Sequence, residues 1–402
     1  RIGAFHAETL SGLPAVDTLV ITDAREGVGD EVAARLRAGH PQARVEVVRP
    51  DELLAAGLDG LVVATATNGH AEWIRRGIEG GVPTFCEKPV AGSLAETIEL
   101  ARLESESETP VHIGHQRRFD VGFRRVREAV ASGELGFVHT IRANTHDQAP
   151  PPAEFIPTSG GIFRDCGVHD FDAIRFVTGR EIASVYAVGA NKGADFFTEG
   201  GDVDTGAAVP TLDDDTLVLM STTRYNGGGH DVRMEVMGER GTITAGLDHS
   251  LAMTSAEPDV DFPRGPQRWS FMERFLPAYR AELTAFFEVA AGRAPSPCTI
   301  ADALEAFRTA EACELSRAQR RPVVPGREWR AAQACRRLGH ARWPAAGEHV
   351  AERGAQCRRF ERLDQHRLEA GLAQIAVDVT LARGGMGDRG RRQPQAAQFG
   401  QQ

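Results

Sequence analysis

The chain has 402 residues, of which 42% are hydrophobic and 25% are charged. This composition is ordinary for a globular protein with two domains and excludes a disordered or fibrous one. The formal net charge of −10 gives no electrostatic reason for a nucleic-acid or anionic membrane partner, so we expect neither.

The chain has no apolar run near the roughly 20 residues that span a bilayer, and we see no leader at its start. We therefore predict a cytoplasmic protein. Its six cysteines have no C-x-x-C spacing, which indicates neither a disulfide framework nor a zinc site. We expect no metal.

The first part of the chain alternates between strand and helix signals. In chain order these are a helix at 1–10, a strand at 16–23, a helix at 28–38, a strand at 45–48, a helix start at 50–52, a strand at 58–65, a helix at 72–80, a strand at 84–86, a helix at 94–105 and a strand at 111–114. This alternation predicts an α/β Rossmann domain with a doubly wound parallel sheet, at residues 1–117. Because such a domain begins with a strand before its first helix, we expect the first strand to be missing.

The pattern changes after the proline-rich residues 149–153. A longer strand signal at 138–146 stands just before these prolines, and further ones follow without intervening helices at 182–190, 216–224, 231–237 and 241–245, with two helices after them at 274–291 and 299–319. We predict an α+β substrate and oligomerisation domain at 118–325, built on a large, mostly antiparallel sheet.

Residues 326–402 differ from both domains, with fourteen arginines, no lysine and little periodicity. Such a segment cannot bury enough apolar area to offset its ordering entropy. We expect a disordered or non-native tail outside the fold, which limited proteolysis would remove without loss of activity. A basic interaction tail is the alternative.

Two residues indicate a dinucleotide site. Asp23 ends a predicted strand and lies twenty residues after Gly3, the spacing between the last glycine of the G-x-G-x-x-G fingerprint and the acidic residue that binds the ribose. A carboxylate there accepts the ribose hydroxyls of NAD and repels the 2′-phosphate of NADP. Arg25 leaves some room for that phosphate.

A second cofactor segment follows the predicted strand at 58–65. Thr65, Thr67 and Asn68 are small or hydrogen-bonding residues that would let the dinucleotide approach the backbone. His70 either contacts the cofactor or caps the next helix.

Lys88 is one of only two lysines and stands between Glu87 and Pro89, at the carboxyl end of the strand predicted at 84–86. Ligands of open α/β sheets bind beyond such ends. Further on, Asp165 and His169 are four residues apart, which predicts one face of a helix. These three side chains suffice to remove a proton from an alcohol, whereas a partnered lysine and an ordinary helix pair are the structural alternative.

Together these motifs resemble the glucose-fructose oxidoreductase / inositol dehydrogenase (Gfo/Idh/MocA) family over roughly residues 1–325. The residues that carry the resemblance are Gly3, Asp23, Thr67-Asn68-Gly69-His70, Glu87-Lys88-Pro89, Arg117-Arg118-Phe119-Asp120 and Asp165-Cys166-Gly167-Val168-His169. Within the family the chain looks most like the inositol 2-dehydrogenases.

The resemblance implies NAD-dependent oxidation of a secondary hydroxyl of a cyclic polyol, most simply myo-inositol. Another inositol isomer, an aldose sugar or a non-catalytic NAD-binding regulator are the alternatives. It also implies that Glu87 and Lys88 lie at the cofactor, that Lys88 contacts the reacting oxygen, and that the protein is a homotetramer or homodimer.

For the chemistry we expect His169 to take the hydroxyl proton, since an imidazole titrates near working pH. Asp165 would fix its tautomer, and Lys88 would stabilise charge on the oxygen. Lys88 acting as the base is the opposite assignment and stays open. Further substrate contacts are expected from Arg118, Asn144, His146 and Tyr279.

Overall fold

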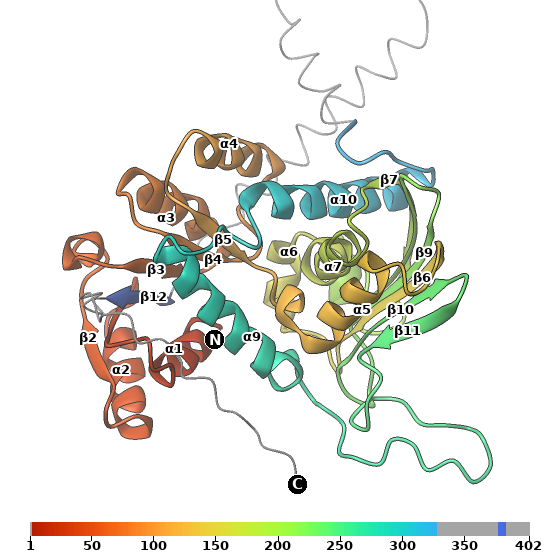
Figure 1. The fold of residues 1–402 in the computed structure, drawn as a ribbon, viewed down its shortest axis with the longest axis horizontal. Coiled ribbons are helices and arrows are strands. Elements are labelled where there is room, and N and C mark those ends of the chain that lie inside the picture. Colours follow the sequence, from red (N-terminus) through yellow and green to blue (C-terminus); the bar gives the residue numbers. More distant parts are fainter. Residues whose placement is uncertain (1, 328–376, 383–402) are drawn as a thin grey trace, which may run out of the picture.

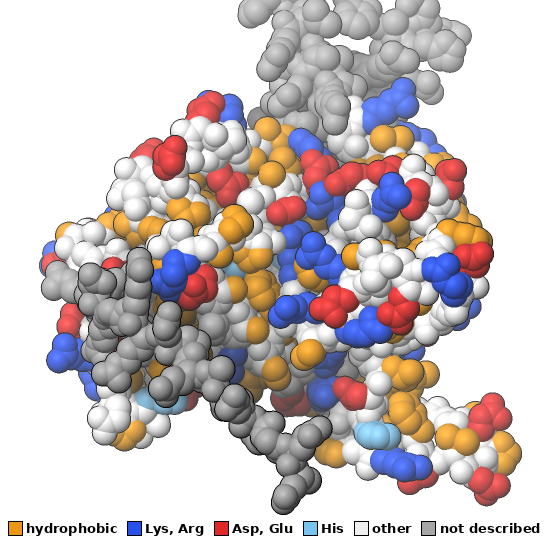
Figure 2. All heavy atoms as spheres, viewed as in Figure 1, with side chains coloured by type: hydrophobic (Ala, Val, Ile, Leu, Met, Phe, Trp, Pro, Cys, Tyr) orange, Lys and Arg blue, Asp and Glu red, His pale blue; other side chains and the backbone are white. Residues whose placement is uncertain are grey.

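The computed structural model describes residues 2–327 and 377–382, and its helices and strands are arranged around two separate sheets (Figure 1). None of the helices in this part of the chain is long and apolar enough to cross a membrane. On the face seen in Figure 2, acidic and basic side chains are interspersed over both lobes.

The first sheet has the strand order β2-β1-β12-β3-β4-β5. Apart from β12, which is described below, its strands are β1 (Thr18–Asp23), β2 (Arg44–Val47), β3 (Gly60–Val63), β4 (Thr84–Glu87) and β5 (Val111–Gly114). The pairs β1–β2, β3–β4 and β4–β5 are parallel, as a Rossmann domain requires. β3, β4 and β5 are buried at every residue, so both faces of the sheet are covered.

Helices cover the two faces of this sheet. α1 (Ile2–Ser11) and α2 (Val28–Gly39) pack on one face together with α9 (Phe271–Ala290), and a buried cluster there includes Leu10, Leu36 and Phe286. α3 (Thr67–Glu79) and α4 (Leu94–Ser105) pack on the other. Because α9 comes late in the chain, the second half of the sequence returns to complete the first domain.

Two predicted elements of this domain differ in the structure. α3 begins at Thr67 rather than at Glu72, because Thr67 and Asn68, which favour caps and turns, form its first turn. The helix start predicted at 50–52 gives only the 3₁₀ turn η1 (Leu53–Ala56), which ends at Gly57 in the left-handed region.

The strand β12 (Val377–Ala382), dark blue in Figure 1, lies between β1 and β3 and is antiparallel to both. For these six residues the structure differs from our prediction that 326–402 lies outside the fold. The physical reason is that two buried strands facing a gap would leave backbone N–H and C=O groups unpaired, and β12 pairs with both of them. Residues 328–376 and 383–402 lie outside the described residues.

The second sheet has the order β11-β10-β6-β9-β8-β7, and all its pairs are antiparallel except β6–β9. Its strands are β6 (Val138–His146), β7 (Ile182–Ala190), β8 (Thr205–Leu212), β9 (Leu217–Thr223), β10 (Asp231–Gly238) and β11 (Gly241–Ala245). The α5 (Val121–Ala131), α7 (Val168–Thr178) and α10 (Ile300–Gln319) helices lie against one face (Figure 1), where the largest buried cluster forms.

Four features of this domain were not predicted, and the first is the helix α5, which precedes β6. β8 was missed because Gly206, Ala207 and Pro210 are poor strand formers. Helices do separate β6 from β7, namely η3 (Ala153–Phe155), α6 (Ile156–Ser159), the π-helical turn η4 (Phe163–Gly167) and α7, and α8 (Phe196–Glu199) separates β7 from β8. The link between the domains, residues 116–119, forms a further 3₁₀ turn, η2 (Gln116–Phe119).

Candidate active site

Lys88 follows β4 directly and reaches across to the second domain. Its Nζ lies 3.0 Å from the carbonyl oxygen of Asp165 and 3.1 Å from Asp165 Oδ1. The Lys88 side chain is only 18% exposed. The structure therefore brings together two of the three residues that the sequence selected for chemistry.

Asp165 has a second cationic partner. Its Oδ2 accepts a hydrogen bond of 2.7 Å from Arg224 Nη2. Burial alone would raise the pKa of this carboxyl, but the charges and hydrogen bonds of Lys88 and Arg224 outweigh burial and hold the pKa well below its usual range. Asp165 is therefore an ionised carboxylate held between two cations.

The structure corrects our prediction that Asp165 contacts His169. Asp165 lies in the π-helical turn η4 and His169 at the start of α7, so the two do not share one face of a regular α-helix. The partners of Asp165 within residues 2–327 are Lys88 and Arg224, and His169 Nδ1 is buried there without a hydrogen-bond partner. Asp165 does not fix the tautomer of His169 in this structure.

His169 faces another imidazole. Its ring lies 5.8 Å from the ring of His115 in an edge-on arrangement, and His115 Nδ1 lies 3.6 Å from Asp172 Oδ2. Burial, followed by the nearby charges of Lys88 and Arg117, lowers the pKa of His169 well below its usual value. The imidazole is therefore uncharged, and the shift moves its pKa away from the working pH on which our prediction of a matched base relied.

Glu87 anchors the backbone of Lys88. One of its carboxylate oxygens lies 2.6 Å from His6 Nε2 on α1, and the other accepts a hydrogen bond from the Lys88 backbone N–H. Burial would raise the pKa of Glu87, but the hydrogen bond from His6 and the charges of His6, Lys88 and His70 together outweigh burial and lower it. Glu87 is 7% exposed and ties the strand end that carries Lys88 to the first helix.

The end of β1 fits the ribose of a dinucleotide. The Asp23 side chain is fully buried; its Oδ1 accepts a hydrogen bond from the Arg25 backbone N–H, and its Oδ2 has no partner among the described residues. A buried carboxylate oxygen without a donor costs free energy, which a ribose hydroxyl would recover. Gly3 lies in the first turn of α1, where free backbone N–H groups favour a phosphate.

The segment after β3 lies at the end of that strand, but the structure places Thr67, Asn68 and His70 inside the helix α3 and not before it. Thr65 is buried at the strand end, and Thr67 and Asn68 open α3. His70 is no cap, because it lies within the helix, where Nδ1 is 2.7 Å from the carbonyl oxygen of Pro89 and Nε2 is 3.1 Å from that of Thr65. It therefore joins the cofactor segment to the segment that carries Lys88.

Comparisons with known proteins agree with this geometry. Residues 1–115 match the model of the oxidoreductase family with an NAD-binding Rossmann fold, and residues 123–244 match the GFO/IDH/MocA C-terminal domain. The chain is 38% identical to a myo-inositol dehydrogenase (Hyg17) of Streptomyces leeuwenhoekii, over 79% of this chain and 94% of that protein. The chain belongs to the GFO/IDH/MocA oxidoreductase family.

Further relatives support the same assignment. The chain is 32% identical to a scyllo-inositol 2-dehydrogenase (NAD⁺) of Bacillus subtilis, over 73% of this chain and 85% of that enzyme. Among solved structures, a myo-inositol dehydrogenase of Corynebacterium glutamicum superposes with a TM-score of 0.71 at 30% identity, over 81% of this chain and 96% of that one. The fold predicted from sequence is confirmed, and NAD is the cofactor of the matching family model.

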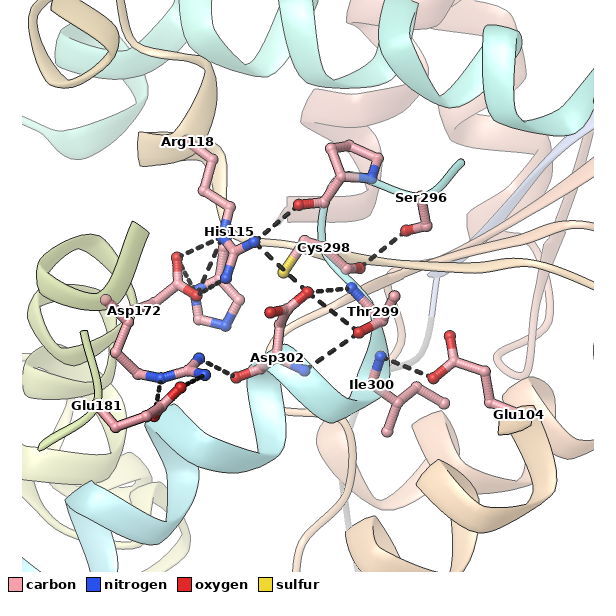
Figure 3. Close-up of polar contacts among 12 residues, drawn as sticks. Glu104, His115, Arg118, Asp172, Glu181, Ser296, Cys298, Thr299, Ile300 and Asp302 are labelled. Atoms are coloured by element: carbon pink, nitrogen blue, oxygen red, sulfur yellow. Dashed lines mark hydrogen bonds and ion pairs between the residues drawn. The ribbon is translucent and has the colours of Figure 1, made fainter. Parts of the chain in front are cut away.

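The structure gives Arg118, one of the expected substrate residues, a different place in this GFO/IDH/MocA protein. Its guanidinium is buried and donates to both carboxylate oxygens of Asp172 and to the carbonyl oxygen of Pro297 (Figure 3). Figure 3 also shows Glu104 of α4 accepting a hydrogen bond from the Ile300 N–H at the start of α10. Arg118 is therefore part of the junction between the domains, because a fully paired buried arginine has little left to offer a ligand.

The other three expected substrate residues also have protein partners. Asn144 donates to the Asp231 carbonyl oxygen, and His146 Nε2 lies 2.9 Å from Ser221 Oγ. Tyr279 is 4% exposed and packs edge-on against the His6 ring. Tyr279 thus packs against the ring of His6, which in turn pairs with Glu87. Asn144 and His146 lie on the half-buried face of β6.

Sequence reasoning missed the residues that complete the site in this family member. Arg224 and Asp147 directly follow the residues that pair in the parallel β6–β9 ladder, and His230 directly precedes β10. A signal was present, since each is a polar residue at a predicted strand end. Finding them required the pairing of β6 with β9, which local sequence patterns do not specify.

Proposed function

We propose that this protein is an NAD-dependent dehydrogenase that oxidises a secondary hydroxyl of a cyclic polyol, with myo-inositol as the leading substrate and the 2-keto product. The observation that carries the proposal is the contact between Lys88, at the end of a Rossmann strand, and Asp165 of the second domain. The inositol dehydrogenases that this chain resembles supply the substrate class.

Oxidising the alcohol requires that a proton leave oxygen and a hydride leave carbon. NAD, when bound along Gly3 and Asp23, supplies the hydride acceptor. The ammonium of Lys88 has three donors, and among the described residues its hydrogen bonds are the two to Asp165, which leaves one donor for the substrate oxygen. A donor aimed at that oxygen stabilises negative charge as the proton departs.

His169 is the base in this proposal. Burial and then the charge of Lys88 lower its pKa, so the imidazole is neutral before the proton moves, and its protonated form is disfavoured. The role of Asp165 changes from our sequence prediction, because it holds Lys88 and not His169. His115, whose ring faces His169, keeps the imidazole packed from the other side.

The test is NADH formation with a panel of inositol isomers and aldoses. Turnover with a cyclic polyol, lost in Lys88→Met and His169→Gln variants that still bind NAD by calorimetry, is the expected result. A wild-type protein that binds NAD but turns over no member of the panel would favour the non-catalytic regulator instead.

We also propose that the uncovered face of the second sheet is a homo-oligomer interface. Tyr186, Val209 and Leu219 occupy one row across three adjacent strands, and each is 39% to 47% exposed. Val188 and Leu217 extend this apolar surface. A contiguous apolar sheet face in water is stabilised when a second copy covers it.

Light scattering after size-exclusion chromatography measures the oligomeric state of the protein. Leu219→Glu is expected to lower the molar mass from that of a dimer or tetramer to that of a monomer. Val121→Glu is the matched control, since Val121 is 78% exposed on α5, away from the sheet face. A wild-type monomer would refute the interface.

A further inference from the structure

Arg224 is a buried cation of the site that our mechanism does not yet use. Its side chain is 3% exposed and lies just beyond the carboxyl end of β9. Its guanidinium bridges two carboxylates, with Nη2 2.7 Å from Asp165 Oδ2 and Nη1 3.2 Å from Asp147 Oδ2. A buried arginine with two carboxylate partners is held in one orientation by its planar fork.

These contacts form one connected series across the site. Lys88 bonds Asp165 Oδ1, Arg224 bonds Asp165 Oδ2 and Asp147, and His230 Nδ1 lies 3.3 Å from Asp147 Oδ1. Two cations therefore alternate with two carboxylates, so the charges of the four ionised groups balance. Every carboxylate oxygen in the series has a neighbour.

The balance matters because Asp165 determines where Lys88 points. If the Oδ2 side of Asp165 lost its partner, the carboxylate would be free to rotate toward Lys88 and to take up the donor that the substrate oxygen needs. Asp147 and Asp165 would also repel each other without the cation between them. The position of the Lys88 ammonium thus depends on a residue of another strand that it does not touch.

We propose that Arg224 is a positioning residue of the dehydrogenase, which fixes the carboxylate of Asp165 so that Lys88 presents its free donor to the reacting oxygen. Asp147, flanked by His230 and by the thiol of Cys166, fixes Arg224 in turn. This inference rests on the proposed polyol dehydrogenase function. It assigns Arg224 to turnover and not to the binding of NAD, which the first domain holds.

The kinetic test compares Arg224→Met and Arg224→Lys with wild type. Misplacing one group in a preorganised site lowers the reaction rate by up to ~100-fold. We therefore expect kcat to fall roughly 100-fold in Arg224→Met and roughly 10-fold in Arg224→Lys, with smaller changes in KM. In a variant that already carries Asp165→Asn, adding Arg224→Met should lower kcat by less than about a further 3-fold, because both changes break the same contact.

Arg274→Met is the matched control for the loss of a buried ion pair. Arg274 is 11% exposed and bonds Asp120 at 2.6 Å, outside the series that reaches Lys88. It should lower thermal stability much as Arg224→Met does while leaving kcat within about 2-fold of wild type. Arg224→Lys keeps the test open if Arg224→Met does not fold.

The two lysines of the chain give a readout that does not require activity. Protein labelled with ¹³C at lysine Cε shows one resonance from Lys88 and one from Lys192. In both Arg224 variants the Lys88 resonance should shift while that of Lys192 stays in place. An unmoved Lys88 resonance, or unchanged kcat in a folded variant, would overturn the inference. A wild-type protein without polyol turnover would instead overturn the proposed function and leave the resonance test to decide about Arg224.

Discussion

His112 makes the folded protein sensitive to acid. It is fully buried on β5, stacks on Phe119 with the ring centroids 5.6 Å apart, and also touches Phe85 and Phe286. Neither ring nitrogen has a hydrogen-bond partner among the described residues. Burial, followed by the charges of Arg118 and His115, lowers the pKa of His112 to about 3.

The sign of the effect follows from comparing the two states. The unfolded chain binds a proton on His112 below roughly pH 6.5, whereas the folded protein does not bind one until about pH 3, so the free energy of unfolding falls as pH falls through this window. Between about pH 7.5 and about pH 5, His112 alone accounts for a loss of about 2 kcal/mol.

Urea unfolding at these two pH values, followed by circular dichroism, measures the loss. His112→Phe should reduce it by about 2 kcal/mol, because the variant has no proton to gain in the unfolded state. Phe286→Leu is the control, since it loosens the same cluster but keeps the imidazole, and it should lower stability equally at both pH values. An unchanged acid loss in His112→Phe would refute the reasoning.

Three further predictions concern cofactor, catalysis and fold. Lys88→Arg keeps the charge but loses the point-donor geometry, and kcat should fall roughly 100-fold or more, whereas retained turnover would remove Lys88 from the mechanism. Asp23→Ser should weaken NAD binding by roughly 10- to 100-fold and reduce the preference of the protein for NAD over NADP. Calorimetric titration with both cofactors measures this, and an equal weakening of NAD and NADP binding would count against the ribose contact. A chain ended after residue 327 lacks β12 and should melt at a lower temperature by calorimetry; an unchanged melting temperature would support our original prediction for the tail.

Most elements were predictable because their sequence patterns are local. The strands at 111–114, 138–146, 182–190 and 241–245 and the helix at 94–105 have the predicted bounds. The helix at 94–105 begins after Ser93, whose side chain accepts a hydrogen bond from the Glu96 N–H. The strand β8 was not predicted because Gly, Ala and Pro give no strand signal. Its position in the sheet is set by pairing with β7 and β9.

The site shows the same division between local and long-range information. Lys88, Asp165 and His169 were found because each lies in a short motif with a chemical reason. The assignment of Asp165 to His169 was wrong because their spacing assumed an α-helix where a π-helical turn occurs. Arg224 reaches Asp165 only through the pairing of β9 with β6 and the packing of η4 on that sheet, so no spacing in the sequence could have indicated the contact.

The position of β12 bears on the order in which this protein is made. Thr18 on β1 pairs with Ala382, so the middle of the first sheet joins segments from widely separated stages of synthesis. Within the described residues, β1 with β2 and β3 with β4 and β5 form two parallel groups that β12 joins. Until residue 382 has been synthesised, the edges of β1 and β3 that face β12 lack that partner.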